Sequence, residues 1–319
     1  MRVSCLHLLA LPLLLVDCGS KQDLLIGEVA PVTSEGGSSI IIPTAGVSGE
    51  ATAAGTAQGG MPGSAGSAVI EPGAAGAAEG GTPTVDPCLD GEEPAADSLI
   101  HRYSFDGTGT IVVDAMGGDE GTVVGGAMLD GSGVLKLAGN RDGQPDEYVN
   151  LPNGLISGLS QVTIVVWTTW EGGAGYQRVF DFGISDQGEV QGGSGRSYLA
   201  VMPTTGFANG TELGAEVAAP GFATQQLPSA HDIKDRPSVV ALAYRSAVDV
   251  ELSVDGESLI RTPTPVALSD IQDKNNWIGQ SQWSKDHAYH GSYDEFRIYN
   301  AALTPCQLRT LVMRGADAP

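Results

Sequence analysis

A short segment near the end of the chain gathers side chains that could bind a ligand. Trp283, His287, Tyr289 and His290 lie close together in sequence, and planar aromatic faces beside polar groups are typical of small-molecule and sugar sites. The spacing of His287 and His290 could also suit a transition metal, but no further ligand follows at a matching spacing. We expect these four residues to form a ligand site. The alternative, an aromatic residue packing over a sheet edge, explains the segment equally well.

The four cysteines fall into two pairs. Cys5 and Cys18 lie in or directly after an apolar N-terminal run, whereas Cys88 and Cys306 lie far apart in the remaining chain. Neither Cys88 nor Cys306 has a second thiol or a histidine at ligand spacing, which argues against a metal or catalytic role. In an exported protein, such a remaining pair predicts a disulfide between Cys88 and Cys306.

The N-terminus predicts export. Residues 1–17 place a positive charge before an apolar run that is too short to span a bilayer comfortably, which is typical of a signal peptide. The run ends in a sequence similar to a bacterial lipobox, in which Cys18 would be lipidated. Asp17 stands where a lipobox usually has a small residue, so secretion without a lipid is the alternative. We expect an exported protein of the cell envelope, either an outer-membrane or surface lipoprotein or else a secreted protein.

Composition separates a linker from a folded domain. From Gly19 to Pro87 the chain is mostly Gly, Ala, Ser, Thr and Pro with scattered acids and no aromatic residue. Such a segment cannot bury enough apolar surface to offset chain entropy, so residues 18–96 are predicted to be a disordered tether. From Asp97 onward aromatic, aliphatic and turn residues mix, which predicts a folded domain over residues 97–316. The tether would hold this domain away from the membrane.

The net charge of −22 over 319 residues limits the classes of partner. An acidic surface argues against nucleic acid, which needs clustered cations. It is compatible with divalent cations, although solubility alone explains it as well. We expect no nucleic-acid partner, and contact with a membrane only through a lipid anchor.

The elements that must position these residues are predicted to be strands. Apolar runs of strand length alternate with turn residues, and the strongest, 162–170, is apolar on both faces. Asp255-Gly256 is a hairpin signal. Thr304 to Gln307 forms a capping box before a short helix that Gly315 ends. The pattern predicts an all-β fold, a two-sheet antiparallel sandwich with a short C-terminal helix.

Three motifs, in order, resemble the laminin-G-like jelly roll, a branch of the concanavalin A-like lectin/glucanase superfamily. They are Val254-Asp255-Gly256, Ile278-Gly279 and Asp294-Glu295-Phe296-Arg297-Ile298-Tyr299. Each motif is weak alone, but their order and spacing match the family over residues 99–308. The resemblance implies a jelly roll whose first and last strands are neighbours, an arrangement that suits the Cys88–Cys306 disulfide.

The resemblance also implies a structural calcium ion where the first and last strands meet. Calcium takes six to eight oxygen ligands, and Asp106, Asp114 and Asp294 are the candidates. The match is loose at Asp114, because Met116-Gly117 replaces the family's Ser/Thr-Gly. Alternatively, Asp106 and Asp114 are turn residues that bond their own backbone, and Asp294 pairs with Arg297 or Arg102.

The superfamily includes glycoside hydrolases, so catalysis is a possible function. Retaining members need two carboxylates about 5–5.5 Å apart, but Asp294 and Glu295 are adjacent on a predicted strand and Glu171 has no partner two residues on. Nucleophile-elbow and zinc-protease motifs are missing from the sequence. We therefore expect a non-enzymatic cell-surface module that binds a carbohydrate or a surface protein. A glucanase-type hydrolase and a purely structural or adhesive envelope component are the alternatives.

Overall fold

The computed structural model describes residue 88 and residues 91–140, 143–205 and 212–318. The predicted signal peptide, the predicted lipidation of Cys18 and most of the predicted tether lie outside these residues. Within them, no helix is both long enough and apolar enough to cross a membrane.

Strands make up most of the described chain, because β-branched and aromatic residues alternate between turn residues along it. In chain order the elements are β1 (Leu99–Tyr103), β2 (Thr108–Gly109), β3 (Ile111–Val112), β4 (Gly121–Val124), β5 (Leu129–Asp130), β6 (Leu135–Ala138), β7 (Tyr148–Leu151), β8 (Gln161–Trp170), β9 (Phe180–Ser185), β10 (Gly195–Met202), β11 (Gly214–Ala218), β12 (Gln225–Pro228), β13 (Pro237–Arg245), β14 (Asp249–Val254), β15 (Glu257–Pro263), the 3-10 turn η1 (Leu268–Asp270), β16 (Asn275–Ile278), β17 (His290–Tyr299) and α1 (Pro305–Arg314).

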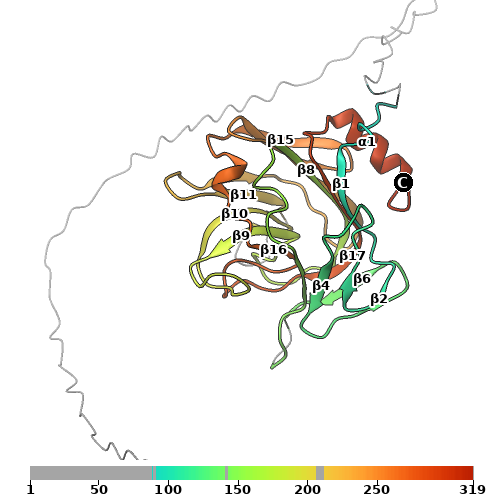
Figure 1. Ribbon diagram of the computed structural model, residues 1–319, viewed down its shortest axis with the longest axis vertical. Helices are drawn as coiled ribbons and strands as arrows, with labels where there is room; N and C mark the ends of the chain where they lie inside the picture. Colours follow the sequence, from blue (N-terminus) through green and yellow to red (C-terminus); the bar gives the residue numbers. More distant parts are fainter. Residues whose placement is uncertain (1–87, 89–90, 141–142, 206–211, 319) are drawn as a thin grey trace, which may run out of the picture. The chain divides into compact units, whose positions relative to one another are not determined.

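These strands form two large antiparallel sheets (Figure 1). The 7-stranded sheet has the order β1-β17-β8-β13-β14-β15, and β6 pairs with the other half of β17. The 8-stranded sheet has the order β12-β11-β10-β9-β16-β7-β4-β3, and β2 and β5 form a small separate ribbon. The first and last strands, β1 and β17, are neighbours as expected. The predicted all-β sandwich with a C-terminal helix is therefore confirmed.

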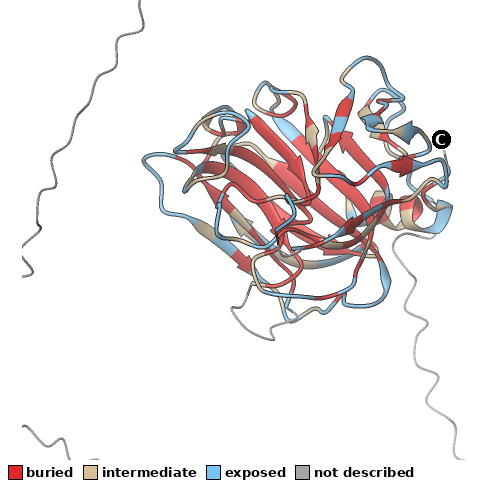
Figure 2. Cartoon of the chain, turned by 90° about the horizontal axis from the view of Figure 1, so that it is seen from below, coloured by how far each residue is buried: buried red, intermediate tan, exposed pale blue. Residues whose placement is uncertain are grey.

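The main core lies between the sheets, where alternate residues of the long strands point inward. Val162, Ile164 and Val166 of β8 are fully buried there. Phe296 of β17 meets Phe182 of the other sheet, with 6.0 Å between ring centroids. Figure 2 shows the buried residues concentrated in the strands and the exposed ones in the loops.

A second apolar cluster lies on the outer face of the 7-stranded sheet. Val165 and Trp167 of β8 point outward, yet both are buried. Leu308 and Leu311 of α1 belong to the same cluster and pack onto them. The two apolar faces of residues 162–170 are therefore buried by different partners. The inter-sheet core covers one face, and the C-terminal helix covers the other.

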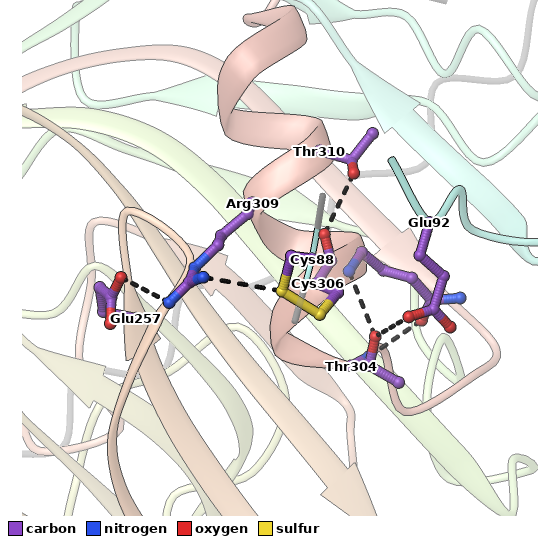
Figure 3. The surroundings of a disulfide bond; sticks show 8 residues. Cys88, Glu92, Glu257, Thr304, Cys306, Arg309 and Thr310 are labelled. Carbon is purple, nitrogen blue, oxygen red and sulfur yellow. Dashed lines mark hydrogen bonds and ion pairs between the residues drawn. A yellow bond between two sulfur atoms is a disulfide. The ribbon is translucent and has the colours of Figure 1, made fainter. Parts of the chain in front are cut away.

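The start of α1 follows the predicted capping box. The Thr304 hydroxyl accepts from the Gln307 amide, and the Gln307 side chain accepts from the Thr304 amide. Cys306 in the first turn forms a disulfide with Cys88, 218 residues earlier (Figure 3). The predicted pairing of these two cysteines is present.

The segment before the predicted domain boundary also contacts α1. The Thr304 hydroxyl donates to Glu92 at 3.1 Å, and Arg314 pairs with Glu93 at 2.6 Å. Together with the disulfide, these contacts attach residues 91–96 to the helix. Contacts with the helix thus extend to residues that precede residue 97, the predicted start of the folded domain.

Candidate ligand-binding site

A pocket of about 330 Å³ lies on the outer face of the 8-stranded sheet. It combines three aromatic rings with charged and polar groups. Its lining residues are Tyr176, Arg178, Tyr198, Glu216, Thr224, Gln226, Trp283 and Asp286.

The pairing register of four neighbouring strands places the polar residues of this pocket opposite one another on one face of the sheet. Asp181, Ala200, Glu216 and Gln226 are paired side by side across β9, β10, β11 and β12. Their chain neighbours on these strands face the core, so these four residues face outward. Residues from four separate strands thus lie in one row beneath and beside the pocket.

Trp283 is the exposed aromatic residue of the site, with 38% of its surface accessible. It lies in the loop between β16 and β17, and its backbone neighbours are joined to Gly193 by two hydrogen bonds of 2.9 Å. Its indole nitrogen and the Tyr198 ring both lie beside Gly195. A Cβ atom at Gly195 would lie 2.6 Å from the indole nitrogen, so the close approach of the indole requires glycine there. The indole is therefore held in place before any ligand arrives.

A buried ionic cluster supports one wall of the pocket. Arg178 is 1% exposed and donates to Asp181 at 3.3 Å, to Asp286 at 2.8 Å and to the Tyr176 carbonyl at 2.6 Å. Asp181 is fully buried, and its Oδ1 has no hydrogen-bond partner among the described residues. Desolvation raises the pKa of Asp181 to about 7 although Arg178 opposes it. Arg178 is thus committed to protein groups rather than to a ligand.

The remaining polar groups present oxygen and amide atoms to the pocket. Glu216 accepts from Gln226 at 2.8 Å and from the Tyr198 hydroxyl at 3.3 Å. Burial, with a smaller contribution from Glu216, raises the pKa of Tyr198 far above its usual value, so its hydroxyl stays protonated. The arrangement can bond several hydroxyl groups of a ligand beside an aromatic face.

The other three residues predicted for this site lie elsewhere. Tyr289 is fully buried in the main core, and its hydroxyl bonds Thr168 at 2.7 Å, so its assignment to a ligand site was wrong. His287 is exposed and lies 3.1 Å from Asn140, whereas His290 lies 3.4 Å from Glu171. Neither histidine lines the pocket. Trp283 is the one predicted ligand residue found there.

The three aspartates predicted to bind calcium do not form a ligand group in the described part of the chain. Asp114 accepts from the backbone amide of Met116 at 3.0 Å, which is the turn role expected as the alternative. It also accepts from the backbone amide of Arg102, 12 residues earlier, at 2.9 Å. Burial, with Asp317 and Asp106 contributing, raises the pKa of Asp294. The site that the family implies therefore does not fit these three residues as an oxygen-only cage.

The alternative for Asp294, an ion pair with Arg297 or Arg102, is not found among the described residues either. Arg102 and Arg297 bind the next residue, Glu295, at 2.6 and 2.7 Å. The register of β17 against β8 shifts between Tyr293 and Glu295. This irregularity lets Glu295, rather than Asp294, lie among the arginines.

A different group of side chains has metal-ligand spacing. His101, Asp114 and Asp119 each offer one atom, and these atoms lie within 4.8 Å of one another. The His101 Nδ1 is 2.9 Å from Asp114 and 3.7 Å from Asp119. Calcium prefers oxygen ligands alone, whereas a mixed nitrogen and carboxylate set suits manganese or zinc.

Sequence analysis missed most of the pocket. Arg178, Tyr198, Glu216 and Gln226 occur in four separate segments of the chain, so no local motif contains them. One signal was available, since Glu216 is a charged residue at the centre of the apolar strand Gly214–Ala218. A charged residue at an outward position of a mostly buried strand indicates that this face of the sheet has a role other than apolar packing.

Comparisons with known proteins agree with this architecture. A family profile described as the concanavalin A-like lectin/glucanases superfamily, of the laminin-G type, matches residues 142–309. A comparison with curated proteins gave no match.

Solved structures resemble the domain at low sequence identity. Domain 4 of AbnA, an extracellular GH43 arabinanase from Geobacillus stearothermophilus, is 20% identical, with 66% of this chain and 97% of that one covered and a TM-score of 0.48. The binding domain of Botulinum neurotoxin DC, in complex with rat synaptotagmin II, is 14% identical, with 68% and 51% covered and a TM-score of 0.53. A botulinum neurotoxin type C structure, described with two ganglioside molecules, is also 14% identical, with the same coverage and a TM-score of 0.51. The chain spans about half the length of these neurotoxin domains, and the likeness shows a shared fold.

Proposed function

The chain belongs to the concanavalin A-like lectin/glucanases superfamily, and from this premise we propose that it is a non-catalytic carbohydrate-binding module outside the cell. The observation that carries the proposal is the exposed, immobilised Trp283 beside the polar groups of the pocket. A sugar ring offers an apolar C–H face that packs on an aromatic ring and hydroxyls that pair with carboxylate, amide and phenol groups. Trp283 supplies the first kind of contact, and Tyr198, Glu216 and Gln226 supply the second.

Export is part of the proposal. The Cys88–Cys306 disulfide supports it, since such bonds persist in oxidising compartments. The apolar leader at residues 1–17 would direct export, and a lipid on Cys18 would anchor the chain to the envelope through the tether. Replacing Cys18 with alanine should move the protein from the membrane fraction to the soluble fraction. Wild-type protein that is already soluble would show that the chain is secreted without an anchor.

The absence of catalysis is supported by the state of the carboxylates. Asp181 has a pKa suited to acid catalysis, but it is fully buried behind Arg178 and cannot reach a substrate. Asp286 is bound by Arg178 at 2.8 Å and by the Ser281 hydroxyl at 2.8 Å. A glycosidase needs two carboxylates that both face the substrate. Of the acids that line the pocket, only Glu216 is not bound by Arg178.

A surface protein is the second class of partner, since the neurotoxin binding domain with this fold is described in complex with synaptotagmin II. The geometry of this chain favours a carbohydrate. A stable protein interface buries more than about 1,000 Å² of total surface and so needs a broad contact face. The candidate site is instead a concave pocket with a volume of about 330 Å³. Such a pocket suits a small polar ligand.

A glycan array followed by calorimetry on the mature chain tests the proposal. Trp283→Ala should weaken binding of the selected glycan by about tenfold or more, because the stacking surface is lost. Met313→Ala is the control, since Met313 is 74% exposed and lies on α1. Release of reducing sugar from the bound glycan would instead support a hydrolase. Failure to bind any glycan would contradict the proposal.

We also propose a structural cation at His101, Asp114 and Asp119. The nitrogen donor predicts that Mn²⁺ or Zn²⁺ raises the melting temperature more than Ca²⁺ does, and binding to the folded state at a hundredfold excess over Kd stabilises it by about 2.7 kcal/mol. His101→Ala should remove the response. A rise with Ca²⁺ alone that Asp294→Ala removes would instead restore the oxygen-only site at Asp106, Asp114 and Asp294.

A further inference from the structure

Trp283 stands between two hollows. A second hollow of about 360 Å³ lies beside the first, and Trp283 and Asp286 line both. The second hollow is completed by the turn after β9, including Asp186, and by Lys285. We infer that the two hollows form one groove that binds at least two consecutive residues of a neutral glycan chain, with Trp283 at the junction. This inference rests on the proposed function and specifies the ligand of that same site.

The volumes support two subsites rather than one. Each hollow is near the lower end of the range of about 300–1,000 Å³ that small-molecule sites occupy. Each can therefore hold a ligand of one or two rings. An indole shared by both hollows offers its surface to the rings on either side of one glycosidic bond.

The walls of the second hollow are held rigidly against Trp283. Asp186 accepts from the Ser194 amide at 2.8 Å, and Gly193 pairs with the backbone on both sides of Trp283. A Cβ atom at Gly193 would lie 2.2 Å from the Asp186 carboxylate, so the small size of glycine lets this carboxylate pack closely against the turn. The turn after β9 and the loop carrying Trp283 are thus one connected unit. Because both hollows exist before binding, a chain can occupy them at low cost in ordering.

The charges of the groove select against acidic sugars. In the first hollow the single cation, Arg178, is already bound by Asp181 and Asp286, and Glu216 has no ion pair among the described residues. A sugar carboxylate there would face two carboxylates without a free cation, which is unfavourable. In the second hollow, hydrogen bonds led by the Ser194 amide lower the pKa of Asp186. Asp186 therefore stays ionised and offsets the charge of Lys285.

Calorimetry on the mature chain tests the inference with oligosaccharides of one to six units from the neutral cello, xylo and chito series and from acidic oligogalacturonides. For whichever neutral series binds, the Kd should fall about tenfold or more from the monosaccharide to the di- or trisaccharide. Longer oligosaccharides of that series should bind with about the same Kd as the trisaccharide. Oligogalacturonides should bind at least about tenfold more weakly.

Two matched variants separate the hollows. Gln226 and Gln187 are both exposed, and each donates an amide hydrogen bond to the carboxylate of its own hollow, Glu216 or Asp186. Gln226→Ala should weaken binding of monosaccharide and oligosaccharide alike. Gln187→Ala should weaken binding of the oligosaccharide and leave the monosaccharide unchanged. Circular dichroism of each variant checks that the fold is intact.

The outcomes distinguish this inference from the function on which it rests. Equal affinity for monosaccharide and oligosaccharide, abolished by Trp283→Ala, would keep the carbohydrate site and overturn the two-subsite groove. Oligogalacturonides binding as tightly as the neutral series would overturn the selection against acidic sugars. No binding of any saccharide would overturn both the groove and the proposed function.

Discussion

Two buried arginine clusters lie on the outer faces of the two sheets, and they differ in what covers them. On the 7-stranded sheet, Arg297 donates to Glu295 at 2.7 Å and to the carbonyls of Ala316 and Ala318 at 2.6 Å each. Its guanidinium also lies 5.0 Å from the Trp167 ring centroid. The chain that follows α1 therefore seals this cluster.

Among the residues that the structure describes, no segment covers the cluster on the 8-stranded sheet in this way. Arg178 is equally buried, but Asp181 keeps one oxygen without a partner among the described residues, and Asp286 borders both hollows. The same kind of ion cluster thus stabilises the fold on one face and borders the candidate ligand site on the other. The difference arises from the C-terminal segment, which covers one sheet and leaves the other open.

The largest expected effect is the loss of the sealed arginine. Arg297→Ala leaves Glu295, which is 1% exposed, with Arg102 alone. Breaking a buried ion pair by removing one partner costs about 3–5 kcal/mol, measured as the free energy of unfolding in urea. Arg178→Ala is the matched change on the open face and should cost less, because Asp181 can take up a proton and Asp286 is partly exposed. Equal losses would show that the two clusters are equivalent.

The next effect concerns the attachment of the covering helix. The double change Cys88→Ser and Cys306→Ser removes a link of 218 residues in sequence, and loss of a native disulfide typically costs about 2–4 kcal/mol. Unfolding of the reduced wild type gives the same comparison without mutation. Glycan binding should stay unchanged, since the site lies on the other sheet. A loss of binding in the folded double variant would show that the two faces are coupled.

The last expected effect, the smallest when it is measured per pH unit, is a dependence of stability on pH at the open face. Asp181 has its pKa raised to about 7, so the folded state binds its proton more tightly than the unfolded state does. This contribution to stability is present below pH about 4 and is lost as pH rises through 7, with a slope of at most about 1.4 kcal/mol per pH unit. Asp181→Asn should flatten that slope, and Asp186→Asn on the exposed turn should not. An unchanged slope in Asp181→Asn would assign the dependence to other acids with raised pKa, such as Glu295.

The parts that were predicted correctly are those that depend on neighbours in sequence. Alternating apolar residues indicate strands, Asp255-Gly256 marks the hairpin between β14 and β15, and Thr304 with Gln307 caps α1. Each of these features is decided within a few residues by backbone geometry and local hydrogen bonds.

The parts that were wrong depend on register and packing. Trp283 and Tyr289 lie in the same short segment of the sequence, yet Trp283 is exposed and Tyr289 is fully buried. Asp114 and Asp294 were grouped as calcium ligands because the first and last strands meet, but the described side chains do not form such a group. The shifted register of β17 also brings Glu295, rather than Asp294, to the arginines.

The sequence by itself determined the sandwich, the family, the terminal helix and the pairing of Cys88 with Cys306. Only the tertiary structure decided which residues line the candidate site, because Tyr198, Glu216 and Trp283 come from β10, β11 and a distant loop. Each residue's own surroundings in sequence reveal its strand and its inward or outward direction. They do not reveal which strands become neighbours or which face the C-terminal segment covers, and those two facts bring the residues of the candidate site together.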